Sequence, residues 1–437
     1  MTQTISDRQI KSLAEQVLLG NLNEQQIASK QIYAAATAAN IRLSSIAEFY
    51  QAIAAGRVAQ KLSVPAVNVR GLTMEIAAAI FRAAREGDVG AFIFELARSE
   101  MGYTKQPPNM YVPLVLAGAL LAGWSGPVFI QGDHYQAKAT SSGIPVAGEI
   151  GTIKALIDSS LAAGMLNIDI DMSTLVDLEK QSVAEQQIPN IRYTNELVSY
   201  IRSLESGIEI SVGGELGHIG GTNSTKQECE VFLSQVPGLR KLSIQTGTEH
   251  GGVVNVDGSL AKMTVDFNLH NELTQYIRSR FGLAGTVQHG ASTLPDEAFA
   301  MLPEVKAVEV HLATGIQNLV FDHPAFPQEL TEKFAEWIFE KRASERKEGM
   351  SDAQLVYRER KRAWGTFKRE LWELPTGVAE QISQAIEWRM GEFFNWLGVK
   401  GTRSLVDGLI THQEFVPDFS VQPAVQQDAT ITENLAD

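Results

Sequence analysis

The chain has a single cysteine, Cys229, among 437 residues, which excludes an intramolecular disulfide. Basic residues are also scarce, because 37 lysines and arginines stand against 51 aspartates and glutamates, for a formal net charge of −14. This balance argues against a nucleic-acid binder or a basic membrane-surface protein, since either needs a positive face. The sequence lacks the run of about 18 apolar residues that spans a bilayer, and the N-terminal MTQTISDRQIK lacks the apolar core of a signal peptide. We therefore expect a cytoplasmic protein that binds neither nucleic acid nor a membrane.

Eight short apolar segments alternate with helical stretches through the middle of the chain. They are PAVNVR, GAFIFELAR, PVFIQGDH, MLNIDIDMS, IEISVGGELG, KLSIQTGTEHG, AGTVQHGAS and VKAVEVHLAT. Strands that alternate with helices over about 250 residues are typical of a closed parallel (β/α)8 barrel, the TIM barrel. A doubly wound open sheet is the alternative. The barrel also predicts that polar residues gather at the C-terminal ends of the strands, and most of these segments end in such residues.

The sequence on either side of the barrel is predicted to be helical. Residues 1–62 have helical periodicity, and from residue 321 long amphipathic helices carry five of the six tryptophans. Such tryptophans more often pack or form interfaces than bind a cofactor, so we expect an extension that covers the barrel or builds a homo-oligomer. The end of the chain lacks periodicity and is expected to be disordered or an exchanged arm. The predicted segments are an N-terminal helical segment (1–62), the barrel (63–320), a helical C-terminal extension (321–415) and the tail (416–437).

Three histidines each follow a predicted strand, in VFIQGDH, LSIQTGTEH and GTVQH: His134, His250 and His289. The C-terminal ends of parallel barrel strands meet at one mouth, so the three imidazoles would converge there. A catalytic zinc site requires three protein ligands and one open position. Asp133 could transfer a proton to or from a metal-bound oxygen, although neighbours in a strand cannot both face the barrel axis. For the Asp-His pair alone a hydrogen bond at the rim is the commoner role, so the metal hypothesis depends on the convergence.

Other polar residues follow the remaining predicted strands. Asp169 and Asp171 share one face of their strand, where two buried like charges need a cation or hydrogen-bond donors. Asp171 and Glu215 are therefore candidates to bind the metal or to support its ligands. The loops after the seventh and eighth strands are the usual phosphate cradle of this fold. Glycines and hydroxyl groups suited to that role are Gly251 after the second histidine, then Gly290, Ser292 and Thr314.

The order of these motifs resembles the class II, zinc-dependent fructose-bisphosphate aldolases and the related tagatose-bisphosphate enzymes. The motifs are DH, IDMS, GGELGHIGG, GTEHG and HGAS, before a last strand that ends in threonine, and the resemblance covers about residues 63–320. It implies that the three histidines hold zinc and that Asp133 handles the proton of the hydroxyl at the cleaved bond. It implies further that Gly251, Gly290 and Ser292 bind the phosphate of dihydroxyacetone phosphate and that Glu215 lies near the metal.

The sequence departs from the family pattern at three places. The family's HGGSG signature is HGAST here, with Ala291 and Thr293. Thr222 and Asn223 stand where the family has an acidic pair that includes its proton-abstracting glutamate. In the last strand the family has a lysine, an asparagine and an aspartate before the threonine, whereas this chain has Glu309, His311 and Ala313. His311 is thus a candidate for substrate contact. The candidates for the missing proton-transfer role are His218, Glu309 and His311.

Together these patterns predict an enzyme, a class II aldolase (an aldehyde-lyase). Its cofactor would be zinc or another divalent cation, and its substrate a phosphorylated sugar such as fructose 1,6-bisphosphate. The metal would polarise the ketose carbonyl while Asp133 deprotonates the hydroxyl. A Schiff-base mechanism is not expected, because Lys138 follows the DH motif and Lys306 begins its strand. Two alternatives stay open: an aldolase-like lyase for a different ketose, and a non-catalytic subunit of a sugar-bisphosphate aldolase.

Overall fold

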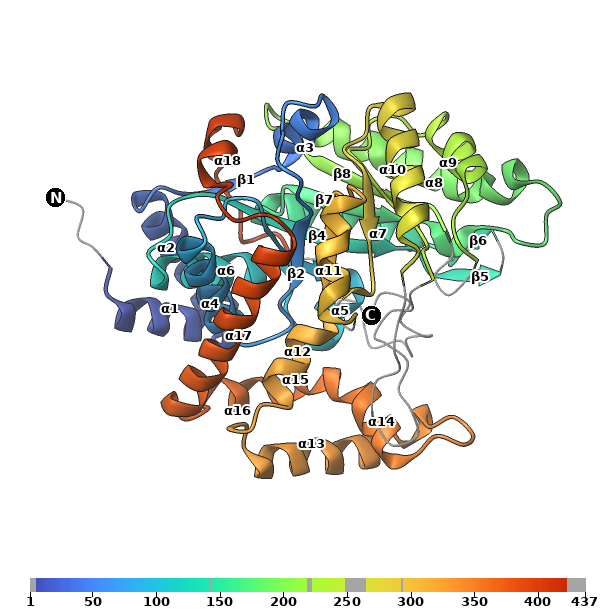
Figure 1. Ribbon diagram of the computed structural model, residues 1–437. Coiled ribbons are helices and arrows are strands. Elements are labelled where there is room, and N and C mark those ends of the chain that lie inside the picture. The colour runs from blue at the N-terminus through green and yellow to red at the C-terminus, as the bar shows by residue number, and fades with distance from the viewer. Residues whose placement is uncertain (1–4, 142, 218–221, 248–264, 292–293, 423–437) are drawn as a thin grey trace.

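A closed barrel of eight parallel strands lies at the centre of the protein (Figure 1). The computed structural model describes residues 5–141, 143–217, 222–247, 265–291 and 294–422. Each barrel strand pairs with the next one along the chain, and the last pairs with the first. All eight strands fall on predicted segments, so the (β/α)8 fold is confirmed. They are β2 (Val64–Asn68), β3 (Ile93–Ala97), β4 (Gly126–Gln136), β7 (Asn167–Asp171), β8 (Ser211–Glu215), β9 (Lys241–Ser243), β10 (Thr286–Gln288) and β11 (Glu309–Leu312).

Helices surround the barrel and bury the outer face of its strands. The residues of β2, β3, β7 and β8 are all buried, as expected for parallel strands that are covered on both sides. A short antiparallel hairpin, β5 (Ala139–Ser141) and β6 (Ile144–Pro145), follows β4. The surrounding helices are α4 (Thr73–Glu86), α5 (Arg98–Thr104), α6 (Pro108–Leu121), α7 (Glu149–Ala163), α8 (Val183–Leu204), α9 (Lys226–Leu233), α10 (Phe267–Phe281), α11 (Asp296–Glu304) and α12 (Thr314–Phe321).

The N-terminal segment contains three helices and a strand that the sequence pattern did not predict. The helices are α1 (Asp7–Leu19), α2 (Leu22–Ala38) and α3 (Ala47–Ala54). Strand β1 (Ile41–Ser44) pairs with the first half of β4, outside the barrel, while the second half of β4 pairs with β7. Four residues are too few for periodicity to distinguish a strand from a loop.

The C-terminal extension packs on one side of the barrel. Its helices are α13 (Gln328–Lys341), α14 (Asp352–Glu359), α15 (Ala363–Thr366), α16 (Lys368–Trp372), α17 (Thr376–Trp396) and α18 (Arg403–Leu409). Helix α17 lies along α4, and α13 to α16 form the lower part of the molecule in Figure 1. Trp364 is buried and stacks on Phe321 with ring centroids 4.4 Å apart, whereas Trp388 is 66% exposed. The boundaries between the four segments stay predictions.

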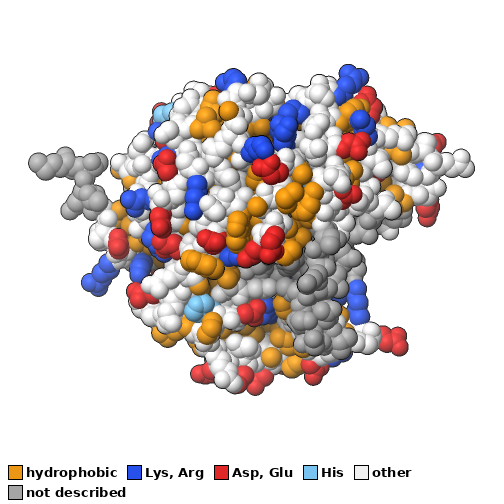
Figure 2. Space-filling view, in the orientation of Figure 1, with side chains coloured by type: hydrophobic (Ala, Val, Ile, Leu, Met, Phe, Trp, Pro, Cys, Tyr) orange, Lys and Arg blue, Asp and Glu red, His pale blue; other side chains and the backbone are white. Residues whose placement is uncertain are grey.

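The end of the described chain lies against the protein. Phe419 is buried, and the Asp418 backbone N–H donates to the Ala162 carbonyl at 2.8 Å. The rest of the predicted tail, residues 423–437, lies outside the described residues. Basic and acidic side chains are interspersed over the face shown in Figure 2. Among the helices of the described residues, none is long and apolar enough to cross a membrane.

Candidate metal and catalytic site

Asp133 and His134 are neighbours in β4, yet both lie in the cluster at the barrel mouth. The pairing of β4 with β7 shifts register between Gly132 and Tyr135, and His134 has a left-handed φ of 40°. A Cβ added to Gly132 would lie 2.4 Å from the Tyr135 ring, so glycine lets the chain bend here. This β-bulge re-aims the side chains. The expectation that only one of the pair could face the barrel axis therefore does not hold.

His134, His289 and Glu215 come together from three strand ends. His134 Nε2 lies 2.9 Å from His289 Nδ1, and Glu215 Oε2 lies 3.5 Å from His289 Nε2. One possible ligand atom of each residue lies within 4.8 Å of the other two, and all three residues are buried. Two imidazoles and a carboxylate form a donor set that suits Zn²⁺, so these residues fit a divalent cation. The third predicted ligand, His250, lies outside the described residues.

Asp171 orients the His134 ring. Its Oδ2 lies 3.0 Å from His134 Nδ1, and its Oδ1 accepts hydrogen bonds from the backbone N–H and the hydroxyl of Ser173 at 2.9 and 2.6 Å. A metal-binding histidine commonly donates its other N–H to a carboxylate in this way, which leaves Nε2 to face the metal. Burial lowers the pKa of His134, but Asp133 and Asp171 outweigh it and raise that pKa to about 10. A cation at Nε2 therefore has to displace a proton.

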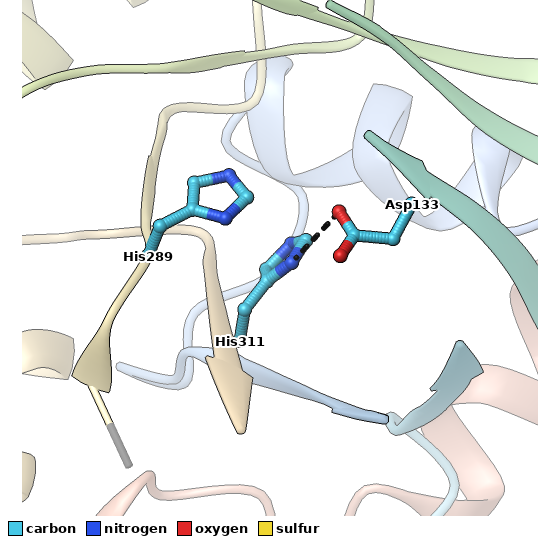
Figure 3. A group of neighbouring side chains, drawn as sticks. All are labelled: Asp133, His289 and His311. Carbon is cyan, nitrogen blue, oxygen red and sulfur yellow. Dashed lines mark ion pairs between the residues drawn. The ribbon is translucent and has the colours of Figure 1, made fainter. Parts of the chain in front are cut away.

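His311 lies beside His289, with ring centroids 4.1 Å apart, and close to the carboxylate of Asp133 (Figure 3). Its Nδ1 is 3.3 Å from Asp133 Oδ1 and 3.1 Å from Glu95 Oε1, and its Nε2 is 2.7 Å from Glu309 Oε1. Burial raises the pKa of Asp133, but His134 and His311 outweigh it and hold that pKa below its ordinary value. The ionised form of the Asp133 carboxylate is therefore favoured.

A buried network beneath this cluster centres on Lys241, which the sequence analysis did not identify. Lys241 Nζ donates to Asp169 Oδ2 at 2.8 Å, to Gln131 Oε1 at 2.9 Å and to Glu309. Burial lowers the pKa of Lys241, but the two carboxylates outweigh it and raise that pKa above its ordinary value. A lysine that stays protonated is a poor amine nucleophile, so this residue does not favour Schiff-base chemistry either.

The sequence pattern that could have identified Lys241 is the alternation of a strand, in which every second side chain faces the inside of the barrel. Lys241 is two residues before Ser243, whose hydroxyl lies 2.9 Å from His289 Nε2. Polar residues repeat with the same spacing in three other strands: Gln131 with Asp133, Asp169 with Asp171, and Glu309 with His311. All these side chains are buried, although barrel interiors are usually filled by apolar residues.

The predicted phosphate-binding residues are only partly described. Gly290 follows β10 with a φ of 64°, and Thr314 begins α12. Gly251 and Ser292 lie outside the described residues, as does His218. Arg70, which the sequence analysis did not single out, has its Nη1 3.4 Å from Thr314 Oγ1 and its Nε 2.7 Å from Glu100 Oε1. The roles assigned to these residues stay predictions.

The fold and this cluster define a (β/α)8-barrel protein with a candidate metal centre at the C-terminal ends of its strands. The chain matches the family described as fructose-bisphosphate aldolase class-II over residues 49–367, and it belongs to that family. A comparison with curated protein sequences gives no match.

Solved structures share the fold at low sequence identity. A Coccidioides immitis protein described as a fructose-1,6-biphosphate aldolase is 19% identical, with a TM-score of 0.50 over 82% of this chain and 97% of that one. The fructose-bisphosphate aldolase of Campylobacter jejuni is 15% identical, with a TM-score of 0.51 over 83% and 97%. The fructuronate-tagaturonate epimerase UxaE of Cohnella laeviribosi is 12% identical, with a TM-score of 0.56 over 78% and 82%. At these identities the likeness shows the fold alone.

Proposed function

We propose that this protein is a metal-dependent aldolase that cleaves or forms a ketose phosphate such as fructose 1,6-bisphosphate. The observation that carries the proposal is the convergence of His134, His289 and Glu215 beside an ionised Asp133, in a chain of the class II aldolase family. Zinc is the preferred cofactor because of the donor set, and other divalent cations are possible. His250 is expected to complete the ligands from outside the described residues.

The residues of the site have separate roles in the proposed reaction. His134 and His289 would hold a divalent cation, which would supply a Lewis acid for the ketose carbonyl. Asp133 takes the proton of the hydroxyl at the carbon–carbon bond that breaks. The electrons of the O–H bond then form the carbonyl of the aldehyde product. The electrons of the carbon–carbon bond pass to the other fragment. Asp171 holds the His134 ring in place through Nδ1.

The substrate is the part of the proposal that the departures from the family pattern affect most. Asn223 is exposed, and its amide lies 3.5 Å from Asp266 Oδ2, so it brings no carboxylate into the cluster. Glu95 and Glu309 flank His311 instead. This arrangement favours one second candidate function, an aldolase-like lyase that acts on a different ketose.

The test is a coupled assay of the purified protein beside analysis of its metal content. The substrates are fructose 1,6-bisphosphate, tagatose 1,6-bisphosphate and a panel of unphosphorylated ketoses. We expect bound metal, release of dihydroxyacetone phosphate, and a loss of about 10²- to 10⁴-fold in kcat for Asp133→Asn, which removes the proton acceptor. Cleavage of an unphosphorylated ketose alone would support the second candidate. Bound metal without cleavage of any ketose would refute the lyase, and absence of metal would refute the centre.

Two further predictions accompany the proposal. A homo-oligomer is expected from the tryptophan-rich C-terminal helices, among which Trp388 is 66% exposed. A cytoplasmic location is expected from the sequence. Sedimentation tests the oligomeric state and cell fractionation tests the location, both independently of the activity assay.

A further inference from the structure

A long groove runs along the outside of the barrel, between the N-terminal and the C-terminal helices. Residues of α1, α4 and α17 line it, and α4 lies between the other two helices in Figure 1. The groove has a volume of about 1590 Å³, and none of its described lining residues belongs to the metal and catalytic site. The proposed function therefore leaves this groove without a role.

The groove has the dimensions of an α-helix. The residues that α17 contributes recur every three or four positions from Thr376 to Glu392, so they lie along one face of that helix. At about 1.5 Å per residue this face is about 24 Å long, and the face that α4 contributes, from Met74 to Glu86, is about 18 Å long. Over a length of about 20 Å, a volume of about 1590 Å³ corresponds to a mean cross-section of about 80 Å², the cross-section of a helix about 10 Å across.

The lining of the groove carries an excess of negative charge. It contains eight aspartates and glutamates against four lysines and arginines. Glu380, Glu387 and Glu392 all come from α17, whose one basic residue, Arg389, pairs with Asp296 outside the groove at 2.6 Å. This field attracts a basic partner and repels an acidic one.

One carboxylate in the groove lacks a partner. Glu75 lines the groove from α4, and its Oε2 is buried without a hydrogen-bond partner among the described residues. Burial raises the pKa of Glu75 above its ordinary value, although its backbone hydrogen bond and Lys11 lower it. A buried polar atom without a partner costs free energy, so a lysine or arginine that reaches this oxygen from the groove stabilises the complex.

Apolar side chains accompany these charges along the groove. Met74, Ala78 and Ala83 line it from α4, and Trp372 and Trp388 line it from the C-terminal helices. Trp388 is 66% exposed, so most of its indole ring is free to contact a partner. Tryptophan is among the residues that most often anchor a protein interface.

We propose that this groove binds a basic amphipathic α-helix of another protein. The apolar face of that helix packs on α4 and against Trp388, while its lysines and arginines face the carboxylates of α17 and Glu75. This is the binding mode in which an amphipathic helix lies in an apolar groove and charges on its flanks set the choice of partner.

A second copy of this chain suits the groove less well. Each copy has a formal net charge of −14, so two acidic surfaces would meet. The basic stretch at residues 358–362 is already partly paired within the chain, because Arg360 donates to Asp322 at 2.8 Å and Arg362 donates to Glu359 at 2.9 Å. The homo-oligomer expected above therefore uses another face of the protein.

Peptide binding to the full chain tests the inference. The probe is a fluorescein-labelled peptide of about 14 residues that carries leucines along one helical face and lysines elsewhere. One comparison peptide has glutamates in place of the lysines, and another has the same composition with leucine and lysine in strict alternation. By fluorescence anisotropy we expect the helical lysine peptide to bind at least about tenfold more tightly than the alternating one, and the glutamate peptide not to bind. Equal affinity for the two lysine peptides would overturn the inference, because it would show attraction by charge alone.

Two pairs of variants locate the binding surface. Trp388→Ala should weaken binding of the helical lysine peptide about tenfold, whereas Phe339→Ala, at a 41% exposed position of α13, should not change it. Glu380→Gln with Glu392→Gln should weaken binding and make it less dependent on salt. Its matched control is Glu370→Gln with Glu373→Gln, at exposed positions outside the groove. Unchanged binding in both groove variants would overturn the inference.

Sedimentation of the protein without peptide examines the other occupant. We expect Trp388→Ala to leave the oligomeric state as it is in the wild type. An oligomer that dissociates in Trp388→Ala but not in Phe339→Ala would assign the groove to a second copy of the chain and overturn the inference.

Discussion

Replacing Lys241 by methionine should strongly destabilise the barrel. The Lys241 side chain is 1% exposed and contacts Asp169 and Glu309, and methionine has a similar length but no charge. The variant leaves two buried carboxylates without their shared cation. Removing one partner of a buried ion pair costs about 3–5 kcal/mol.

The pKa of Glu309 indicates how this loss depends on pH. Burial raises that pKa, but Lys241 and His311 outweigh it and hold it at about 2, against an ordinary value of 4.5. The folded-state pKa of Glu309 is depressed, so its ion pairs stabilise the folded protein fully above the ordinary pKa of 4.5. That stabilisation is lost as the pH falls from 4.5 toward 2. The difference between wild type and variant should therefore be largest at neutral pH and smaller below about pH 4.5.

Urea unfolding of both proteins, followed by circular dichroism at pH 7 and pH 4, measures that difference. Lys154→Met is the matched control, because Lys154 is 30% exposed and its ion pair with Glu196 at 2.7 Å should contribute at most about 1 kcal/mol. Adding Glu309→Gln to Lys241→Met should recover part of the loss, since one unpaired charge is then removed. A loss below about 1 kcal/mol at pH 7 for Lys241→Met, or an equal loss at both pH values, would refute the reasoning.

Three other predictions concern the metal centre. Asp171→Ala should weaken metal binding by about 10- to 100-fold in equilibrium dialysis, because the His134 ring loses its orienting carboxylate; unchanged affinity would contradict that role. Gly132→Ala should lower both the stability of the fold and the metal affinity, because the added Cβ would lie 2.4 Å from the Tyr135 ring. The control Gly151→Ala should reduce neither, because no atom lies within 4 Å of its added Cβ. Equal effects of the two substitutions would show that the bulge is not required. Removal of metal by a chelator should abolish turnover and lower the midpoint temperature of thermal unfolding. Zinc at 100 times its Kd should then raise the free energy of unfolding by about 2.7 kcal/mol. A midpoint that does not depend on zinc would argue against a metal site in the folded chain.

The sequence was informative about the strands because their signal is local. A buried parallel strand is a short apolar run, and each of the eight runs between Val64 and Leu312 became one barrel strand. The convergence of His134 and His289 followed from the same pattern, since both come at strand ends and the closed barrel brings those ends together. Strand β1 was missed because four residues that pair outside the barrel have no periodicity to distinguish them.

By itself, then, the sequence determined the barrel, the order of its strands and the types of residue at its mouth, because these depend on contiguous stretches of chain. Only the tertiary structure decided which of those side chains meet. The bulge that turns both Asp133 and His134 into the cluster depends on the pairing of β4 with β7, and the placement of Lys241 against Glu309 depends on strands 68 residues apart. Register and long-range pairing set such contacts, and no local pattern encodes them.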